Sequence, residues 1–228
     1  MARFHGPGVV TPGLLLYLDA ANIKSYTSNA TVWTDLTLRK QNATLANGPT
    51  YNSDAGGCIV FDGTNDRSNI AHNTYYVSTT GYTISAWFNF SVINTGEVAL
   101  LRKSEAYQLG FQAANTIRCL VYTSGGINGW TSGNDVTYNF LTNNWYNMTM
   151  TWNQSNLRIY VNNVQVKVAT VTGTGFDNRS AALQIGYADS LGYAGLNGKY
   201  SCLLFYNRAL SIEELNRNYN ALRGRFGV

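Results

Sequence analysis

Charged side chains are scarce in this sequence. Asp, Glu, Lys and Arg make up 12% of the 228 residues, about half of the roughly 25% that is usual for a soluble domain. A coiled coil, which needs repeated Glu and Lys positions, is therefore excluded. The 16 basic and 12 acidic residues are scattered along the chain, so no clustered basic face for nucleic acid is expected. Disorder is also excluded, because 45% of the residues are hydrophobic.

Long apolar runs, histidine and cysteine are scarce as well. No apolar run reaches the roughly 18–20 residues of a membrane span, so membrane insertion is not expected. The histidines, His5 and His72, lie in polar segments without a neighbouring nucleophile. No strand carries the paired carboxylates of a glycoside hydrolase. We therefore predict no catalytic residues and no enzyme. The three cysteines, Cys58, Cys119 and Cys202, show no metal-ligand spacing and are expected to be buried free thiols.

Asparagine and threonine take the place of charge, with 27 and 23 residues. Short β-type runs separated by turn residues dominate the chain. In the segment 82–90, Tyr82, Ile84, Ala86, Phe88 and Phe90 alternate with Thr83, Ser85, Trp87 and Asn89, and Trp87 on the polar side indicates a strand covered on both faces. Asn162-Asn163 is typical of a two-residue hairpin turn. These patterns predict an all-β fold, a two-sheet antiparallel jelly-roll sandwich formed by residues 13–228 and preceded by an N-terminal arm at 1–12.

One short helix is expected at the C-terminal end, over about 211–222. Ser211 and Glu214 have the spacing of a capping box. Ile212, Leu215, Tyr219 and Leu222 then form one apolar stripe, which is suited to docking on the sandwich. Gly224 is expected to end the helix.

Two segments are candidate binding sites. In the Gly-, Asn- and Ser-rich loop 122–135, Trp130 could stack on a sugar ring while Tyr122 and Asn128 orient it; the alternative is that Trp130 caps the sandwich or contacts another subunit. At 61–66, Asp62 and Asp66 offer oxygen ligands for calcium, and the alternative is a tight turn that binds only its own backbone. No metal ligand or cofactor is assigned from either segment.

Five ordered segments carry a family resemblance: 61–66 (FDGTND), 82–88 (YTISAWF), 144–152 (NWYNMTMTW), 157–162 (LRIYVN) and 206–215 (YNRALSIEEL). Together they resemble the laminin G-like and concanavalin A-like jelly-roll superfamily. The resemblance implies the same sandwich fold. Where family members often carry a polar turn, this chain has Leu36-Thr-Leu-Arg-Lys40, and it has Ser201-Cys202-Leu203 where an acidic residue is often found. No ligand residue is carried over from the family.

A narrower resemblance involves the segments 13–22, 47–51 and 218–226, which look like those of tailed-bacteriophage structural proteins carrying this domain. It implies a non-enzymatic virion structural protein: an external capsid decoration or head fibre, or a tail-associated domain. Its expected partners are other virion proteins and further copies of itself. The resemblance also implies a location on the virion exterior after synthesis in the bacterial host cytoplasm. The lack of a signal-peptide pattern at the N-terminus fits this expectation, and the alternative is that a leader has been removed. The alternative is a carbohydrate-binding, lectin-like module that recognises host or environmental glycans.

Overall fold

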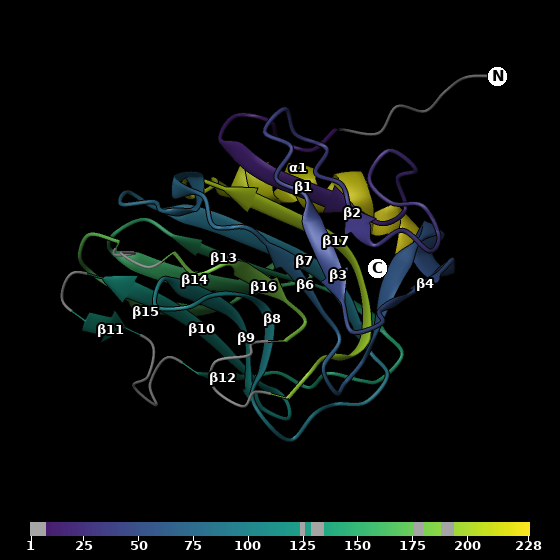
Figure 1. Ribbon diagram of the computed structural model, residues 1–228. Coiled ribbons are helices and arrows are strands. Elements are labelled where there is room, and N and C mark those ends of the chain that lie inside the picture. The colour runs from purple at the N-terminus through teal and green to yellow at the C-terminus, as the bar shows by residue number, and fades with distance from the viewer. Residues whose placement is uncertain (1–7, 124–125, 129–134, 176–179, 188–193) are drawn as a thin grey trace.

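The chain folds into two β-sheets packed face to face, with one helix laid on the outside (Figure 1). This computed structural model describes residues 8–123, 126–128, 135–175, 180–187 and 194–228. The fold is the predicted all-β sandwich with a short C-terminal helix.

Sheet A has eight strands in the order β15-β14-β13-β7-β17-β5-β4, and β1 also pairs with β17. Their bounds are β1 Leu14–Asp19, β4 Thr50–Asn52, β5 Cys58–Asp62, β7 Tyr82–Phe90, β13 Trp145–Trp152, β14 Asn156–Val161, β15 Val164–Thr170 and β17 Asn197–Tyr206. The strand pairings described in this sheet are all antiparallel. The β14–β15 hairpin turns at Asn162 and Asn163, whose φ angles are 46° and 66°, as predicted for a two-residue turn.

Sheet B has nine strands in the order β11-β10-β9-β8-β16-β6-β3-β2, and β12 also pairs with β10. Their bounds are β2 Val32–Trp33, β3 Ala43–Ala46, β6 Arg67–Ile70, β8 Val98–Lys103, β9 Tyr107–Ala113, β10 Thr116–Thr123, β11 Gly126–Asn128, β12 Val136–Thr137 and β16 Leu183–Ile185. The described parts of both sheets thus form the antiparallel sandwich expected from the strand pattern.

The core lies between the sheets and is rich in aromatic rings. Ile84, Phe88 and Phe90 on one face of β7 belong to it, as the alternation predicts. Phe88, Phe90, Phe111 and Phe140 meet edge to face or tilted, with ring centres 5.0–6.0 Å apart. Such geometries stabilise a core beyond the area that they bury.

Helix α1 (Ile212–Leu222) covers the outer face of sheet A. Ser211 accepts a hydrogen bond from the Glu214 amide, and the Glu214 side chain accepts one from the Ser211 amide, which is the predicted capping box. A second apolar cluster beneath the helix joins Leu215 and Leu222 to Trp87, Cys202 and Leu204. Trp87 is therefore buried on the outer face, so β7 is covered on both sides.

Residues 8–12, which the sequence placed in an arm, lie against this helix. The Val10 amide donates to Asn218 Oδ1 (2.8 Å), and the Val10 carbonyl accepts from the Tyr206 hydroxyl (2.9 Å). Arg217 Nε donates to the Gly8 carbonyl (2.8 Å). Residues 1–7 lie outside the described residues.

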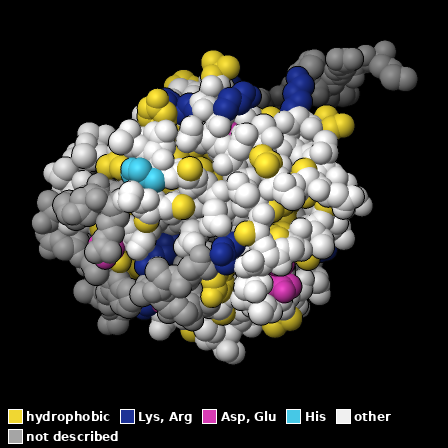
Figure 2. Space-filling model, in the orientation of Figure 1, with side chains coloured by type: hydrophobic (Ala, Val, Ile, Leu, Met, Phe, Trp, Pro, Cys, Tyr) yellow, Lys and Arg dark blue, Asp and Glu magenta, His cyan; other side chains and the backbone are white. Residues whose placement is uncertain are grey.

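The surface reflects the composition. In Figure 2, Lys, Arg, Asp and Glu are sparse and scattered over the visible described face, and most of that face is neutral and polar. No helix in the described part of the chain has the length and apolarity needed to cross a bilayer.

Candidate functional site

The loop predicted to bind sugar is only partly described. Tyr122 lies near the end of β10, half-buried, and its amide donates to the Ala106 carbonyl (2.9 Å). Asn128 lies on β11, where its backbone pairs with Val121. Trp130 falls outside the described residues. The structure thus brings the backbones of Tyr122 and Asn128 onto adjacent strands, and the binding role of all three residues stays a prediction.

Sheet B carries a polar row on its outer face. Thr44, Asn69, Gln184, Arg102 and Gln108 are successive backbone partners across β3, β6, β16, β8 and β9. Directly paired residues project to the same side of a sheet. On each of these strands at least one adjacent residue belongs to the core (Ala43, Ile70, Leu183, Leu101 and Leu109), so this row faces away from it.

Two carboxylates beside this row are held by one arginine. The Arg118 guanidinium donates to both Asp135 oxygens (3.1 and 2.8 Å) and lies 3.9 Å from Glu97. Glu97 also accepts a hydrogen bond from Gln108 Nε2 (3.1 Å). The sequence did not reveal this pair, because the two acids are far apart along the chain. Both carboxylates are engaged by protein side chains, an arrangement typical of an ion-pair network.

An open groove of about 990 Å³ lies beside β1. We call it the β1 groove. One wall comes from the N-terminal segment and β1, the second from the loop 36–41, and the third from the 3-10 turn Thr74–Tyr76 and its cap. Its lining residues are Val9, Thr11, Leu14, Tyr17, Asn22, Leu36, Thr37, Leu38, Arg39, Gln41, Asn73 and Tyr75.

A buried carboxylate shapes the second wall. Asp35 is fully buried and accepts hydrogen bonds from the amides of Tyr17, Thr37 and Gln41 (3.0, 2.9 and 3.0 Å). It also accepts one from the Thr37 hydroxyl (2.6 Å). In addition, the Leu36 amide donates a hydrogen bond to the Tyr17 carbonyl (2.9 Å). The loop is therefore fixed against the edge of β1 that does not pair with β17, and it covers that edge.

The loop 36–41, which Asp35 fixes in place, positions a cation over an aromatic ring. Arg39 Cζ lies 4.2 Å from the centre of the Tyr75 ring. This distance is well within the range of a cation–π interaction. Tyr75 is 48% exposed, and Asn73 holds its turn by accepting the Tyr75 amide at 3.0 Å. The stack therefore offers both a planar apolar surface and a guanidinium to a ligand.

Amide and hydroxyl groups complete the groove. Asn22 Oδ1 accepts from the Lys24 amide and Asn73 Oδ1 accepts from the Tyr75 amide (both 3.0 Å), which fixes both side chains. Fixed amide groups and an exposed ring are the groups that orient a polyhydroxylated ligand. Burial raises the pKa of Tyr17 above its usual range, and the nearby Cys202 and Asp19 add to the increase.

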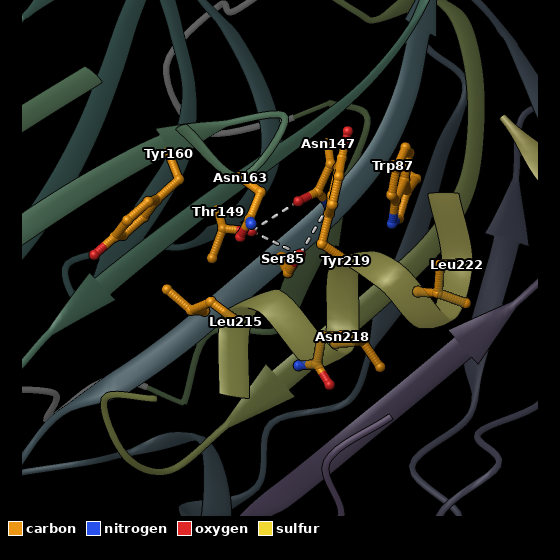
Figure 3. Close-up of a pocket in the computed structure, with 11 residues that line it drawn as sticks. Ser85, Trp87, Asn147, Thr149, Tyr160, Asn163, Leu215, Asn218, Tyr219 and Leu222 are labelled. Atoms are coloured by element: carbon orange, nitrogen blue, oxygen red, sulfur yellow. Dashed lines mark hydrogen bonds between the residues drawn. The ribbon is translucent and has the colours of Figure 1, made fainter. Parts of the chain in front are cut away.

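A second cavity, beneath helix α1, is too small for a ligand. Figure 3 shows Ser85, Asn147 and Thr149 turned toward one another below the helix. Thr149 Oγ1 and Asn147 Nδ2 lie 2.8 and 2.9 Å from Ser85 Oγ. The cavity measures about 10 Å³, roughly the space of one water molecule. We interpret this cluster as part of the packing between the helix and sheet A.

The candidate calcium turn binds its own backbone. Asp66 Oδ2 accepts from the Asp62 amide (3.0 Å), and Asp62 Oδ1 accepts from the Thr64 amide (2.7 Å). No group of three or more His, Cys, Asp or Glu side chains in the described ranges is placed to hold a metal ion. Calcium binding stays an untested prediction.

The β1 groove was not predicted from the sequence. In the sequence, Leu36-Thr-Leu-Arg-Lys40 stands out only as a departure from the polar turn of the family. Asp35 followed by Thr37 was the one available signal, since Asp commonly accepts the amide two residues on. The contact between loop 36–41 and the turn at Tyr75 depends on the tertiary fold.

Comparisons with known proteins agree with the fold. A search of curated proteins gives no match. Among solved structures, the Trypanosoma rangeli sialidase in complex with sialic acid is similar over 93% of this chain and 33% of its own, at 16% identity and a TM-score of 0.67. The binding domain of Paraclostridial Mosquitocidal Protein 1 is similar over 92% of this chain and 52% of its own, at 15% identity and a TM-score of 0.70.

A structure on botulinum neurotoxin type C, whose cell entry depends on two ganglioside molecules, is similar over 92% of this chain and 51% of its own, at 15% identity and a TM-score of 0.70. This chain thus spans about half or less of these structures, and at such identity the likeness shows the fold. The Laminin G 3 family model, described as "Concanavalin A-like lectin/glucanases superfamily", matches residues 62–216. Because this match covers more than half of the chain, the protein belongs to the concanavalin A-like lectin/glucanases superfamily.

Proposed function

We propose that this domain is a non-enzymatic, lectin-like module that binds a glycan in the β1 groove. The observation that carries the proposal is the Arg39–Tyr75 stack, held at the edge of an open groove of about 990 Å³. An exposed ring supplies a flat apolar surface for a sugar, and the fixed amides of Asn22 and Asn73 supply hydrogen bonds that orient it. The similar toxin and sialidase structures support this assignment at the level of the fold.

The contacts of Asp135 and Glu97, together with the lining of the groove, support a binding role over a hydrolytic one. A glycoside hydrolase needs two carboxylates facing the scissile bond. On the outer face of sheet B, Asp135 and Glu97 are instead engaged by Arg118 and Gln108. The β1 groove itself has no Asp or Glu among its lining residues.

The test is a glycan array followed by titration calorimetry with the best ligand, comparing wild type with Tyr75→Ala and Trp130→Ala. Removal of the groove aromatic is expected to weaken binding at least about tenfold, equivalent to roughly 1.4 kcal/mol. The Trp130 variant, which alters the other candidate loop, is expected to bind normally. If only Trp130→Ala lost glycan binding, the binding site would be the loop 122–135 and not the β1 groove. Absence of any glycan binding by the wild type would reject the lectin function.

A second proposal concerns the setting, which the sequence resemblance suggests is the exterior of a tailed-bacteriophage virion. Two of the three segments behind that resemblance are joined in the structure: Arg225 Nη1 lies 2.8 Å from Asp19 Oδ1. This contact supports treating the two segments as one structural unit. Its partners would be other virion proteins or further copies of the chain. Mass spectrometry and cryo-electron microscopy of purified particles test the setting; absence of the chain from every particle rejects it.

A further inference from the structure

We infer that the ligand of the β1 groove is an acidic glycan, that is, a sugar carrying a carboxylate or sulfate group. The inference rests on the proposed lectin function and specifies its ligand class. It starts from the charges at the groove: Arg39 is the only charged side chain among the described lining residues. A groove with one cation and no lining acid favours a ligand of opposite charge.

The neighbouring charges are turned away or already engaged. Lys40 directs its ammonium to the carbonyl of Asp35 (3.5 Å) and does not line the groove. The Asp35 carboxylate is buried and accepts the four hydrogen bonds that hold the loop. Asp19 is buried and paired with Arg225 at 2.8 Å. Neither carboxylate is therefore exposed to meet an incoming anion.

The Arg39 guanidinium is placed to bind an anion. Its Cζ lies over the Tyr75 ring, 4.2 Å from the ring centre. Within the described residues, Arg39 forms hydrogen bonds only through its backbone, as donor to Thr37 Oγ1 and as acceptor from Gln41 Nε2. The in-plane N–H groups are thus available, and their fork matches two oxygens of a carboxylate or sulfate.

Stacking also lowers the cost of binding at this position. A long arginine side chain loses rotamer freedom when it is fixed, and contact with Tyr75 limits that freedom before the ligand arrives. The Tyr75 turn is in turn held by Asn73. The sugar ring would then lie beside the exposed part of Tyr75, with its acidic group on Arg39 and its hydroxyls toward Asn22 and Asn73.

The experiment compares matched pairs of probes by calorimetry: a uronic acid oligosaccharide with its carboxyl-reduced form, and a sulfated oligosaccharide with its desulfated form. Wild type is expected to bind at least one acidic member about tenfold or more tightly than its neutral counterpart. Which pair shows the preference identifies the acidic group. Raising the salt concentration is expected to reduce the preference, because the groove is open to solvent.

Two matched variants locate the effect. Arg39→Gln is expected to lower the affinity for the acidic probe to that for its neutral counterpart, so that the preference is lost. Lys40→Gln removes the same charge from the adjacent position and is expected to keep the preference. If both variants lost the preference for the acidic probe equally, the preference would depend on the overall positive charge and not on Arg39, and the inference would be overturned. Equal wild-type affinity for acidic and neutral probes would also overturn it but leave the lectin function standing, whereas failure to bind any glycan would reject that function itself.

Discussion

The ring of Phe226 stacks on that of Trp87, with centres 4.0 Å apart and planes inclined by 8°. Trp87 lies on the outer face of β7, and Phe226 follows helix α1 near the end of the chain. Trp145 packs beside the pair, 5.0 Å from Phe226. The C-terminal residues are thus an integral part of the layer that covers sheet A.

Phe226→Ala tests this stack. Phe226 is 6% exposed, and removing a buried phenyl ring usually costs about 3–5 kcal/mol. We expect about 3 kcal/mol of lost unfolding free energy, because the neighbouring chain end can relax into the space. Urea unfolding followed by tryptophan fluorescence measures it. Val228→Ala, at an exposed position, is the control and is expected to change stability little; equal effects of the two substitutions would contradict the role of the stack.

Asp35→Asn tests the loop of the β1 groove. The amide keeps the size of the carboxylate but replaces one charged acceptor oxygen with an NH₂ donor, which opposes the amides that now point to it. We expect a loss of about 1–3 kcal/mol in stability and faster hydrogen exchange in residues 36–41. Asp62→Asn, at the exposed end of β5, is the control. Unchanged exchange in 36–41 would mean that the carboxylate does not hold this loop.

Protonation of Glu214 in acid is expected to lower the stability of the folded protein, because it breaks the ion pair with Arg208. The Arg208 guanidinium beside it lowers the pKa of Glu214 from 4.5 to about 2. The pKa of Glu214 is lower in the folded protein than in the unfolded one. The Arg208–Glu214 pair therefore contributes fully to the free energy of unfolding above about pH 4.5, and this contribution is lost as the pH falls toward 2. Both side chains are partly exposed, so we expect only about 1 kcal/mol.

Glu214→Gln is the matched variant, since glutamine still serves in a capping box. Its urea midpoint is expected to fall less than that of wild type between pH 6 and pH 3. A parallel fall in both proteins would show that other groups account for the acid sensitivity.

The three cysteines are expected to be unreactive in the folded protein. All are buried and free, and burial raises the pKa of Cys58 to about 12 and those of Cys119 and Cys202 above their usual range. The thiolate is the reactive form. Ellman's reagent at pH 8 should therefore detect almost no thiol until denaturant is added, when all three react. If one thiol per chain reacted rapidly with the reagent in the native protein, one cysteine would have to lie at the surface.

The sandwich and the helix were predictable because their signals are local. The alternation through β7, the Asn162-Asn163 turn and the Ser211–Glu214 box each occupy adjacent residues. The helix ends at Leu222, as the predicted range has it, but Gly224 does not cap it. Arg223 is the C-cap, and Gly224 lies within the 3-10 turn Arg223–Arg225 that follows.

The β1 groove and the Arg118 ion pairs were not predictable from sequence patterns. Tyr17, Arg39 and Tyr75 belong to three separate segments, and the fold alone brings them together. The residues predicted for sugar binding, Tyr122, Asn128 and Trp130, were selected on loop composition, which carries no information on the shape of a site.

The hydrogen bonds of Asp35 also have a consequence for how fast the groove can be filled. The wall that carries Arg39 forms when the domain folds, so no ordering step has to follow or precede the encounter with a ligand. In a stopped-flow experiment the observed association rate should therefore rise in proportion to ligand concentration. A plateau at high concentration is not expected, because it would require a slow rearrangement of a loop that Asp35 already holds in place.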